Sequence, residues 1–338
     1  MKIDQIANLA GVSKSAVSLA LNGKPGVSHA TREKILKIAK ESGYKHKNFL
    51  DEDLSPKLKI RFLVVKDTSF VHEQYEKMPF FSELIRQVQQ QCANLGFEMT
   101  LSTMELGQLM NNNFDNTIHD QNGVILLGTN LSKEQIVLIK HHYKNVVVLD
   151  TLVPELEVDF VVMNNKMGIY QAVQHLSQLG HQRIGYIKSI ERIPNLDERY
   201  ESFQSAIKQF NLSEEFSQYS ISSNHLGVNA SFQKWFSQLE EAKRPTALLC
   251  ENDYLAISVV KSLLDMDIKV PSQVSVVGFD NIVESIVLTP ELSTVHVDKE
   301  QMAIKSVERL KTIMANEEVS IKVTIDTKFI ARKSTDFI

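Results

Sequence analysis

The sequence predicts a small all-α headpiece followed by a larger α/β region, on three observations. Two short helical patterns at the N-terminus are separated by the turn-like tripeptide Gly11-Val12-Ser13. A polar stretch over residues 45–59 contains Ser55-Pro56-Lys57 and has the composition of a linker. Beyond it, short apolar runs alternate with helical stretches in two successive series. Such alternation is typical of βαβ units and of parallel sheets covered on both faces.

The N-terminal patterns predict a helix-turn-helix completed by a third helix. Small and apolar residues recur at helical spacing on both sides of the turn: Ile3, Ile6, Ala7, Ala10, Ala16, Val17, Ala20 and Leu21. Each flank is only about two turns long, too short to be stable alone. Ser13 is placed as the N-cap of the second helix, and Gly43 ends a third helix over residues 31–42. The alternative is a small helical hairpin inside a larger core.

Charge separates the headpiece from the rest of the chain. Residues 1–47 hold nine Lys and Arg and three acidic residues, so their net charge is +6. The whole chain has a net charge of −4, which leaves −10 for residues 48–338. This split predicts a polyanion partner for the headpiece. The second helix also exposes short polar groups and one cation, which can enter a DNA major groove.

The motif order of residues 2–44 resembles the DNA-binding headpiece of the lactose/galactose repressor family. It runs Ile-Ala-x-x-Ala-Gly-Val-Ser, then Val-Ser, Leu-Asn, Val-Ser, Thr-Arg and Gly-Tyr. The resemblance implies base contacts from Lys14, Ser15 and Leu19. It implies phosphate contacts from Ser18, Asn22, Ser28, Thr31 and Tyr44. Lys2 completes the predicted DNA-binding set, although the family usually has Thr there.

Leu19 is a second departure from the family, which often has Arg at this position. Arg can donate two hydrogen bonds to one guanine, and Leu cannot. Leu19 can instead make an apolar contact, such as one to a thymine methyl group.

The α/β region predicts two lobes of similar build. The expected strands are residues 60–65, 97–101, 124–127, 146–149, 160–163, 184–187, 247–250 and 274–277. The expected helices are residues 80–95, 133–141, 196–210, 228–239 and 254–265.

The family resemblance continues through this region. Its blocks are Leu179-Gly180-His181, Asn252-Asp253, the run from Val270-Pro271 to Asp280, Pro290-x-Leu-Ser-Thr-Val295 and Phe329-Ile-Ala-Arg-Lys-Ser334. This part is similar to periplasmic sugar-binding proteins, which have two Rossmann-like lobes, three crossing segments and a ligand in the cleft. The first lobe is then roughly residues 60–160 with a segment after Pro290. The expected domains are a headpiece over 1–47, a linker over 48–59 and a ligand-binding and dimerisation domain over 60–338.

Seven residues are predicted to contact a small molecule, because ligands of doubly wound sheets lie beyond the carboxyl ends of strands. They are Phe80, Phe81, Asp150, Met163, Asn164, Arg199 and Asp253. One of the two phenylalanines is expected in the cleft and the other in the core. Helix caps and strand-end turns are the commoner roles of Asp and Asn. The resemblance, whose ligand-binding Asp and Arg fall on Asp253 and Arg199, favours ligand contact for those two.

Several classes of protein are disfavoured by what the sequence lacks. There is no run of eighteen apolar residues and no signal peptide, which predicts a cytoplasmic protein without a membrane span. Cys92 and Cys250 lie in apolar surroundings and are expected to be buried free thiols. We expect neither a metal nor a cofactor. The absence of phosphate-loop, dinucleotide and hydrolase motifs disfavours an enzyme, and the basic headpiece disfavours a transport protein.

The sequence therefore predicts a cytoplasmic DNA-binding transcriptional regulator of the repressor type. Its predicted partners are double-stranded operator DNA and a small effector, for which a sugar or sugar derivative is favoured over a nucleobase or a protein co-regulator. A homodimer is expected, because one headpiece offers few base contacts and the leucine-rich tail of the family's tetramers does not follow Arg332.

Overall fold

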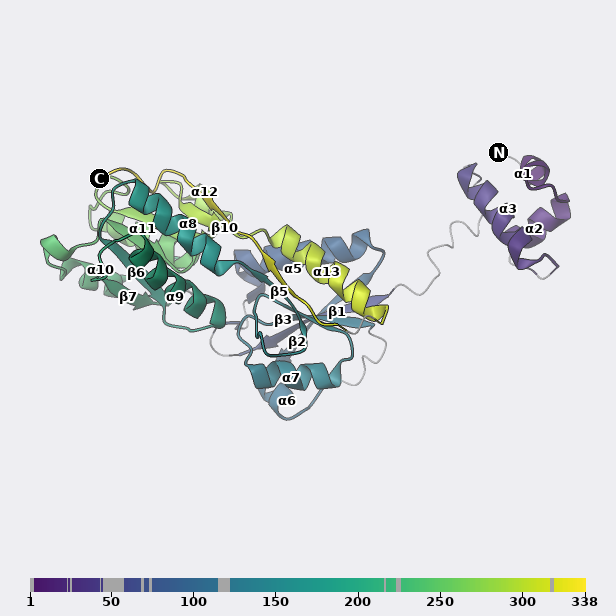
Figure 1. Cartoon of the computed structure of the whole chain (residues 1–338), viewed down its shortest axis with the longest axis horizontal. Helices are drawn as coiled ribbons and strands as arrows, with labels where there is room; N and C mark the ends of the chain where they lie inside the picture. Colours follow the sequence, from purple (N-terminus) through teal and green to yellow (C-terminus); the bar gives the residue numbers. More distant parts are fainter. Residues whose placement is uncertain are drawn as a thin grey trace. The chain divides into compact units, whose positions relative to one another are not determined.

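The computed structural model describes residues 3–22, 24, 26–42, 44, 58–67, 70–72, 75–114, 122–215, 217–222, 226–316 and 319–338. The chain divides into two compact units, Met1–Leu58 and Lys59–Ile338 (Figure 1). The predicted DNA contact Lys2 and most of the predicted linker lie outside the described residues.

The headpiece contains α1 (Ile3–Ala10), α2 (Lys14–Leu21) and α3 (His29–Glu41). Its core consists of the small and apolar residues Ile6, Ala7, Ala10, Val17, Ala20, Leu21, Ile35 and Ala39. The Ser13 hydroxyl caps α2 by accepting the Ala16 backbone N–H at 3.2 Å. The third helix begins two residues before the predicted start, because the Ser28 hydroxyl accepts the Thr31 N–H at 3.2 Å and turns the chain into the helix there.

The first lobe is built on a six-stranded sheet in the order β11-β5-β4-β3-β1-β2, with all strands parallel. Its strands are β1 (Lys59–Lys66), β2 (Glu98–Glu105), β3 (Gly123–Leu127), β4 (Val146–Leu149), β5 (Asp159–Met163) and β11 (Lys322–Ile325). Helices α5 (Pro79–Asn94) and α13 (Lys299–Met314) cover one face, and α6 (Leu106–Met110) and α7 (Lys133–His142) cover the other (Figure 1).

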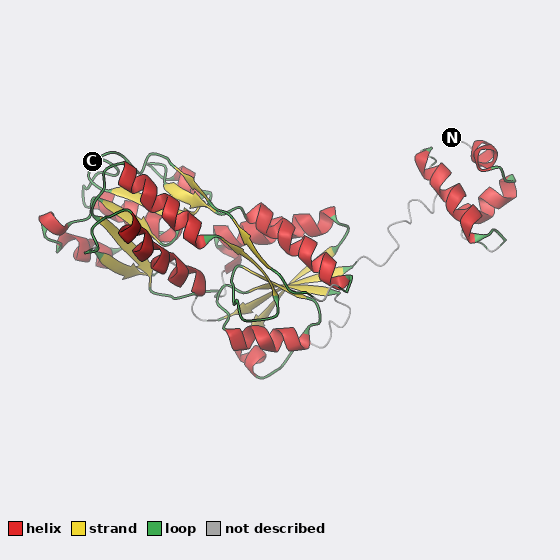
Figure 2. Cartoon of the chain, in the orientation of Figure 1, coloured by secondary structure: helices red, strands yellow, loops and turns green. Residues whose placement is uncertain are grey.

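The second lobe repeats this plan with a sheet in the order β12-β10-β9-β8-β6-β7, in which β12 alone is antiparallel to its neighbour. Its strands are β6 (Ile184–Ser189), β7 (Gln218–Ile221), β8 (Ala247–Cys250), β9 (Ser275–Asp280), β10 (Ser293–His296) and β12 (Lys328–Ile330). Its helices are α8 (Asn165–Gln178), α9 (Pro194–Gln209), α10 (Ala230–Ser237), α11 (Asp253–Asp265) and α12 (Glu284–Val287) (Figure 2). Gly168 in α8 permits close packing, since a Cβ there would lie 2.7 Å from Val295.

Three crossings join the lobes, namely β5 to α8, β10 to α13 and β11 to β12. The C-terminal segment of the first lobe comprises α13 and β11, while β10 belongs to the second sheet. Two short 3₁₀ helices, Tyr75–Lys77 and Glu241–Lys243, complete the larger unit. Cys92 and Cys250 are buried free thiols, as predicted. Within the described residues, no helix has the length and apolar character needed to span a membrane.

Candidate functional site

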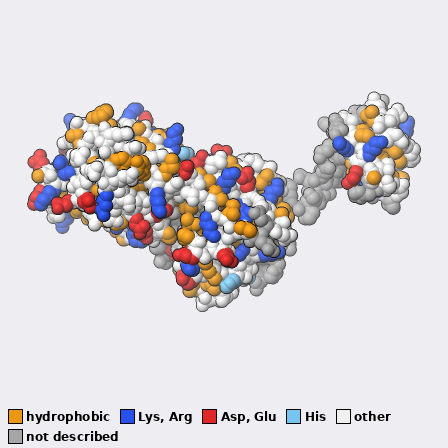
Figure 3. Space-filling view, in the orientation of Figure 1, with side chains coloured by type: hydrophobic (Ala, Val, Ile, Leu, Met, Phe, Trp, Pro, Cys, Tyr) orange, Lys and Arg blue, Asp and Glu red, His pale blue; other side chains and the backbone are white. Residues whose placement is uncertain are grey.

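The exposed side of α2 carries side chains predicted to contact bases, Lys14 and Ser15, and one predicted to contact phosphate, Ser18. Lys14, Ser15 and Ser18 are exposed, and Lys14 forms an ion pair with Asp4 at 2.8 Å. Asn22 follows the helix and donates its amide N–H to the Ser18 carbonyl at 2.8 Å. The visible face of the headpiece shows several Lys and Arg side chains (Figure 3).

Leu19 lies at the edge of this surface and is half-buried against the turn that follows α2. A Cβ on Gly26 would lie 3.2 Å from the Leu19 Cδ1 atom, so this turn fits closely over the leucine. At the start of α3 the Ser28 and Thr31 hydroxyls are hydrogen-bonded at 2.8 Å. Tyr44 packs partly buried against the headpiece core. The described DNA-binding candidates thus lie on α2 and at both ends of α3.

A second candidate site is a cavity between the two lobes, which we call the effector cavity. It has about 370 Å³ of space between its walls, including the part that is open to solvent, and is lined by side chains from both lobes. The lining residues are Phe70, Met78, Phe80, Phe81, Thr129, Asp150, Met163, Ile193, Asn195, Leu196, Arg199, Asn252, Tyr254 and Asp280. Most of them follow the carboxyl ends of strands, the edge at which doubly wound sheets bind ligands.

Asp150 and Asp280 occupy equivalent places in the two lobes. Asp150 directly follows β4 and Asp280 ends β9, and these strands hold the same position in the two sheet orders. Both residues have left-handed backbone conformations, with φ of 69° and 108°. Non-glycine residues adopt such conformations rarely and concentrate at functional sites. The two lobes therefore present a carboxylate each to one cavity.

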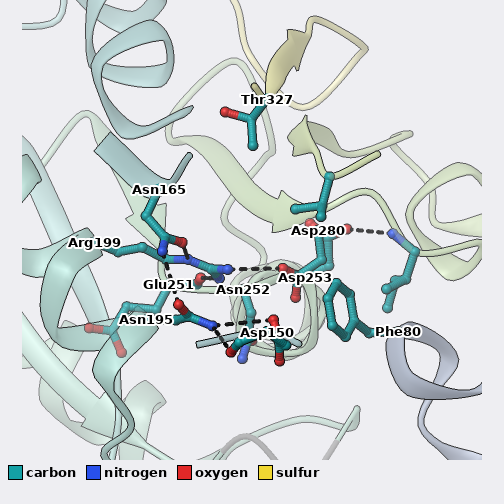
Figure 4. Close-up of polar contacts among 12 residues, drawn as sticks. Phe80, Asp150, Asn165, Asn195, Arg199, Glu251, Asn252, Asp253, Asp280 and Thr327 are labelled. Atoms are coloured by element: carbon teal, nitrogen blue, oxygen red, sulfur yellow. Dashed lines mark hydrogen bonds and ion pairs between the residues drawn. The ribbon is translucent and has the colours of Figure 1, made fainter. Parts of the chain in front are cut away.

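Arg199 is the cation of this cavity and is anchored on three sides. Its Nε donates to the Asn165 side-chain oxygen at 2.8 Å, and its Nη1 donates to the Glu251 carbonyl at 2.6 Å. Its Nη2 is 3.3 Å from an Asp280 carboxylate oxygen, and its guanidinium lies over the Phe279 ring at 3.6 Å (Figure 4). These bonds hold the guanidinium rigidly at the wall.

Burial dominates the electrostatics of the two carboxyl groups. It raises the pKa of Asp150 to about 7, although hydrogen bonds from Thr129 and the charge of Arg199 act to lower it. Burial also raises the pKa of Asp280, against the charges of Arg199 and Lys299. Asp150 therefore changes its protonation near neutral pH.

Several hydrogen bonds cross directly from one lobe to the other beside the cavity, among them one from Asn195 and one from Phe80. The Asn195 amide on α9 donates to the Asp150 carbonyl at 2.9 Å, and the Phe80 N–H on α5 donates to the Tyr254 hydroxyl at 3.1 Å. Figure 4 shows Asn195 next to Asp150, opposite Phe80. These bonds hold the lobes together across the cavity.

The structure places Asp253 below the cavity wall and not in its lining. This side chain is fully buried and accepts hydrogen bonds from the Ile282 N–H at 2.9 Å and the Thr294 hydroxyl at 2.5 Å. A Cβ at Gly278 would lie 2.1 Å from it, so the strand passes directly over the carboxyl group. Asn252, one residue earlier, reaches the cavity, because it is the N-cap whose side chain folds over the start of α11.

Asn164 is likewise absent from the lining, while its neighbour Met163 is part of it. Asn164 caps α8 by accepting the Met167 N–H at 3.0 Å, and its amide donates to Asp326 at 3.0 Å. It therefore links two of the crossing segments. Phe80 and Phe81 both line the cavity and both are buried, so the expected division into one core ring and one cleft ring is wrong.

Sequence reasoning did not single out several lining polar residues, which are Thr129, Asn195, Asn252, Tyr254 and Asp280. Asn252 and Asp280 carry the strand-end signal used for the other candidates, and both fall inside quoted motif blocks. Asn195 and Tyr254 lie within helices, where the sequence offers no comparable signal.

The fold and the cavity define a two-lobed small-molecule-binding domain joined to a helix-turn-helix unit. The family described as "Bacterial regulatory proteins, lacI family" matches residues 2–47, and the "Periplasmic binding protein-like domain" matches residues 173–335. The chain thus combines a lacI-family helix-turn-helix domain with a periplasmic-binding-protein-like domain, and this combination defines it as a DNA-binding transcriptional regulator.

The chain is also similar to named proteins along almost its whole length. It is 27% identical to the probable HTH-type transcriptional repressor ExuR of Bacillus subtilis, over 98% of this chain and 97% of the relative. The lac repressor dimer bound to operator and the anti-inducer ONPF has a TM-score of 0.70 at 20% identity, covering 99% of each chain. A complex of the regulator CelR with cellobiose has a TM-score of 0.69 at 22% identity, again covering 99% of each chain.

Proposed function

We propose that this chain is a cytoplasmic homodimeric repressor whose affinity for a pseudo-palindromic operator is controlled by a neutral carbohydrate. In this proposal residues 1–47 bind DNA, residues 48–59 link the units and residues 60–338 bind the effector and dimerise. The observation that carries the proposal is the convergence of Asp150, Arg199 and Asp280 from both lobes on one cavity.

The chemistry of the lining supports a hydroxyl-rich ligand. Carboxylates accept hydrogen bonds from hydroxyl groups, and the Asn252 side chain adds further hydrogen-bonding capacity. The rings of Phe80 and Phe81 offer apolar surface for the C–H face of a sugar ring. The similarity to the CelR–cellobiose complex is consistent with this ligand class.

The charge of the lining supports a neutral ligand over an anionic one. Among the described lining residues, Arg199 is the only cation, and it is already paired with Asp280. Asp150 adds a second carboxyl group to the same space. A uronate or sugar phosphate would thus meet two acidic groups and a cation that is already neutralised.

Dimerisation through the second lobe is supported by an exposed apolar surface formed by α12 and the residue before it. Three apolar side chains within one helical turn are exposed there: Val283 by 62%, Ile286 by 53% and Val287 by 76%. A cluster of this kind is a common feature of protein interfaces. Sedimentation of the Val287→Glu variant should show a shift from dimer to monomer, whereas an unchanged dimer would place the interface elsewhere.

Calorimetry with matched sugars tests the effector proposal. We expect a neutral aldose or disaccharide to bind and to change operator affinity in a fluorescence anisotropy assay, and the corresponding uronates to bind at least tenfold more weakly. Arg199→Met should weaken binding by about thirtyfold, because a charged hydrogen bond in a closed cleft contributes about 2 kcal/mol. The exposed Arg86→Met change is the matched control. A preference for the uronate would contradict the proposal.

A further inference from the structure

Arg61 is a buried cation on the face of the first lobe that is covered by α6 and α7. It is only 2% exposed, although it carries the largest side chain among the fully buried residues of the described chain. Alternation along β1 puts it on the same face as Leu63 and Val65, which belong to an apolar cluster. The sequence thus places a guanidinium where the neighbouring residues of the strand are apolar.

The hydrogen bonds of Arg61 leave half of its guanidinium without a partner. Its Nη1 donates to the Tyr143 hydroxyl at 2.7 Å, and its guanidinium lies 5.5 Å from the Tyr143 ring centre. Its Nε and Nη2 are buried and have no hydrogen-bond partner within the described part of the chain. Buried charges are ordinarily paired or hydrogen-bonded, because removing them from water is costly.

The two unpartnered nitrogens are chemically specific. Nε and Nη2 lie on one edge of the guanidinium plane and present two parallel N–H groups. This edge matches the two oxygens of a carboxylate or phosphate group and binds them in a bidentate manner. This edge of Arg61 is therefore buried and without a partner, while the other edge donates to Tyr143.

Arg61 also lines a pocket with polar walls. It is lined by Arg61, Leu63, Ser102, Thr103, Met104, Gln108 and Asn113 and opens to solvent. The Ser102 hydroxyl is a second buried group without a partner. Hydroxyl and amide groups supply hydrogen-bond donors, and none of these lining side chains is acidic.

We propose that Arg61 and Ser102 form a binding site for a small oxyanion, a carboxylate or phosphate group, on this face of the first lobe. The site shares no lining residue with the effector cavity. The two sites also differ in charge pairing. Arg199 in the effector cavity is paired with a carboxylate, and Arg61 is not. The proposal does not depend on the nature of the effector.

The test uses the full chain with inorganic phosphate and, separately, acetate as probes in calorimetry at constant ionic strength set with chloride. We expect saturable binding of at least one probe to the wild-type protein and a loss of at least tenfold in affinity for Arg61→Met. Preference for one probe identifies which oxyanion group the site accepts. Arg86→Met, which removes an exposed arginine, should bind as the wild type does.

A second variant and a second measurement guard against a folding defect. Ser102→Ala keeps the guanidinium and should weaken binding several-fold. Arg61→Met should keep or raise the melting temperature without added anion, because it replaces an unpaired buried charge by an apolar chain of similar length. Equal probe affinity in wild-type and Arg61→Met proteins, or no binding of either probe to the wild type, would overturn the proposal.

Discussion

Asp150 connects the geometry of the effector cavity with its response to pH. It lies at the end of β4 with a left-handed backbone, so its carboxyl group is held among the cavity walls. Thr129 and Asn195 hydrogen-bond to it, yet burial still raises its pKa to about 7. The ionised form is thus costly to bury and is also the better acceptor for ligand hydroxyl groups. The fold therefore keeps the pKa of this carboxyl group close to neutral pH.

This raised pKa predicts a pH dependence of stability. An unfolded Asp has a pKa of about 3.9, so between that pH and neutrality the folded state retains a proton that the unfolded state has lost. The stabilisation from Asp150 is fully present below the unfolded pKa and is lost as the pH rises through about 7. Asp150→Asn removes this dependence. Relative to the wild type, the variant should gain melting temperature from pH 5.5 to 8.

The exposed Glu155→Gln change serves as the control, since its melting curve should follow that of the wild type at every pH. Parallel curves for wild type and Asp150→Asn across the same range would contradict the assigned titration.

From the sequence, individual residues of the cavity lining could be predicted only to within one position along the chain. The strand-end rule selects the right edge of each sheet, which is why Asp150, Met163 and Arg199 line the cavity. It cannot decide between neighbours such as Asn252 and Asp253, because their side chains leave the backbone in different directions. That choice depends on the N-cap geometry of α11 and on the strand that crosses above it.

At the scale of elements, most internal strands were predictable from sequence, whereas the edge strands β7 and β11 were not. Strands such as β3 and β4 are buried on both faces and appear as continuous apolar runs. The edge strands β7 and β11 mix exposed with half-buried positions, so neither pattern is distinctive. Their pairing is decided by tertiary contacts that local sequence does not encode.

The crossing segments carry a testable interaction between Asn164 and Asp326. The family often has Asp at the position of Asn164, but here an acid would face the carboxylate of Asp326 at about the present 3.0 Å contact. We expect Asn164→Asp to lower the free energy of unfolding by about 1 kcal/mol, since the pair is partly exposed and screened. Urea denaturation measures this loss.

The double variant Asn164→Asp with Asp326→Asn restores a neutral donor opposite the acid and should recover most of the lost stability. If the double variant is as unstable as the single one, the two side chains are not coupled.

At the scale of the whole molecule, the chain combines two units that each have their own hydrophobic core. The headpiece core contains Ile6, Val17 and Ile35, and the larger unit spans Lys59–Ile338. Separate cores predict that either unit keeps its structure without the other. Deleting residues 1–47 should therefore abolish operator binding while leaving effector affinity within about twofold of the wild type, as measured by gel shift and calorimetry. Retained operator binding would assign DNA recognition to another surface.

The predicted linker departs in sequence from the family pattern. In the family, the residues after the third helix often fold on the operator into a hinge helix, and a leucine from each subunit kinks the minor groove. Here the matching stretch, residues 48–55, lies outside the described residues and contains Asp51, Glu52 and Asp53. Alignment from Tyr44 puts Asp53 at the position of the wedge.

We predict that this hinge does not insert. Three successive carboxylates are repelled by the phosphates and by the partner's matching acids across the two-fold axis, and a wedge requires an apolar side chain. The protein should then contact the operator mainly in the major groove and bend it little. Its affinity should depend only weakly on the sequence of the central base step. A fluorescence or circular-permutation bend assay on the cognate operator, with Leu50→Ala and Leu54→Ala alongside, measures this. A sharp kink that either substitution removes would show that one of these leucines supplies the wedge through a shifted register.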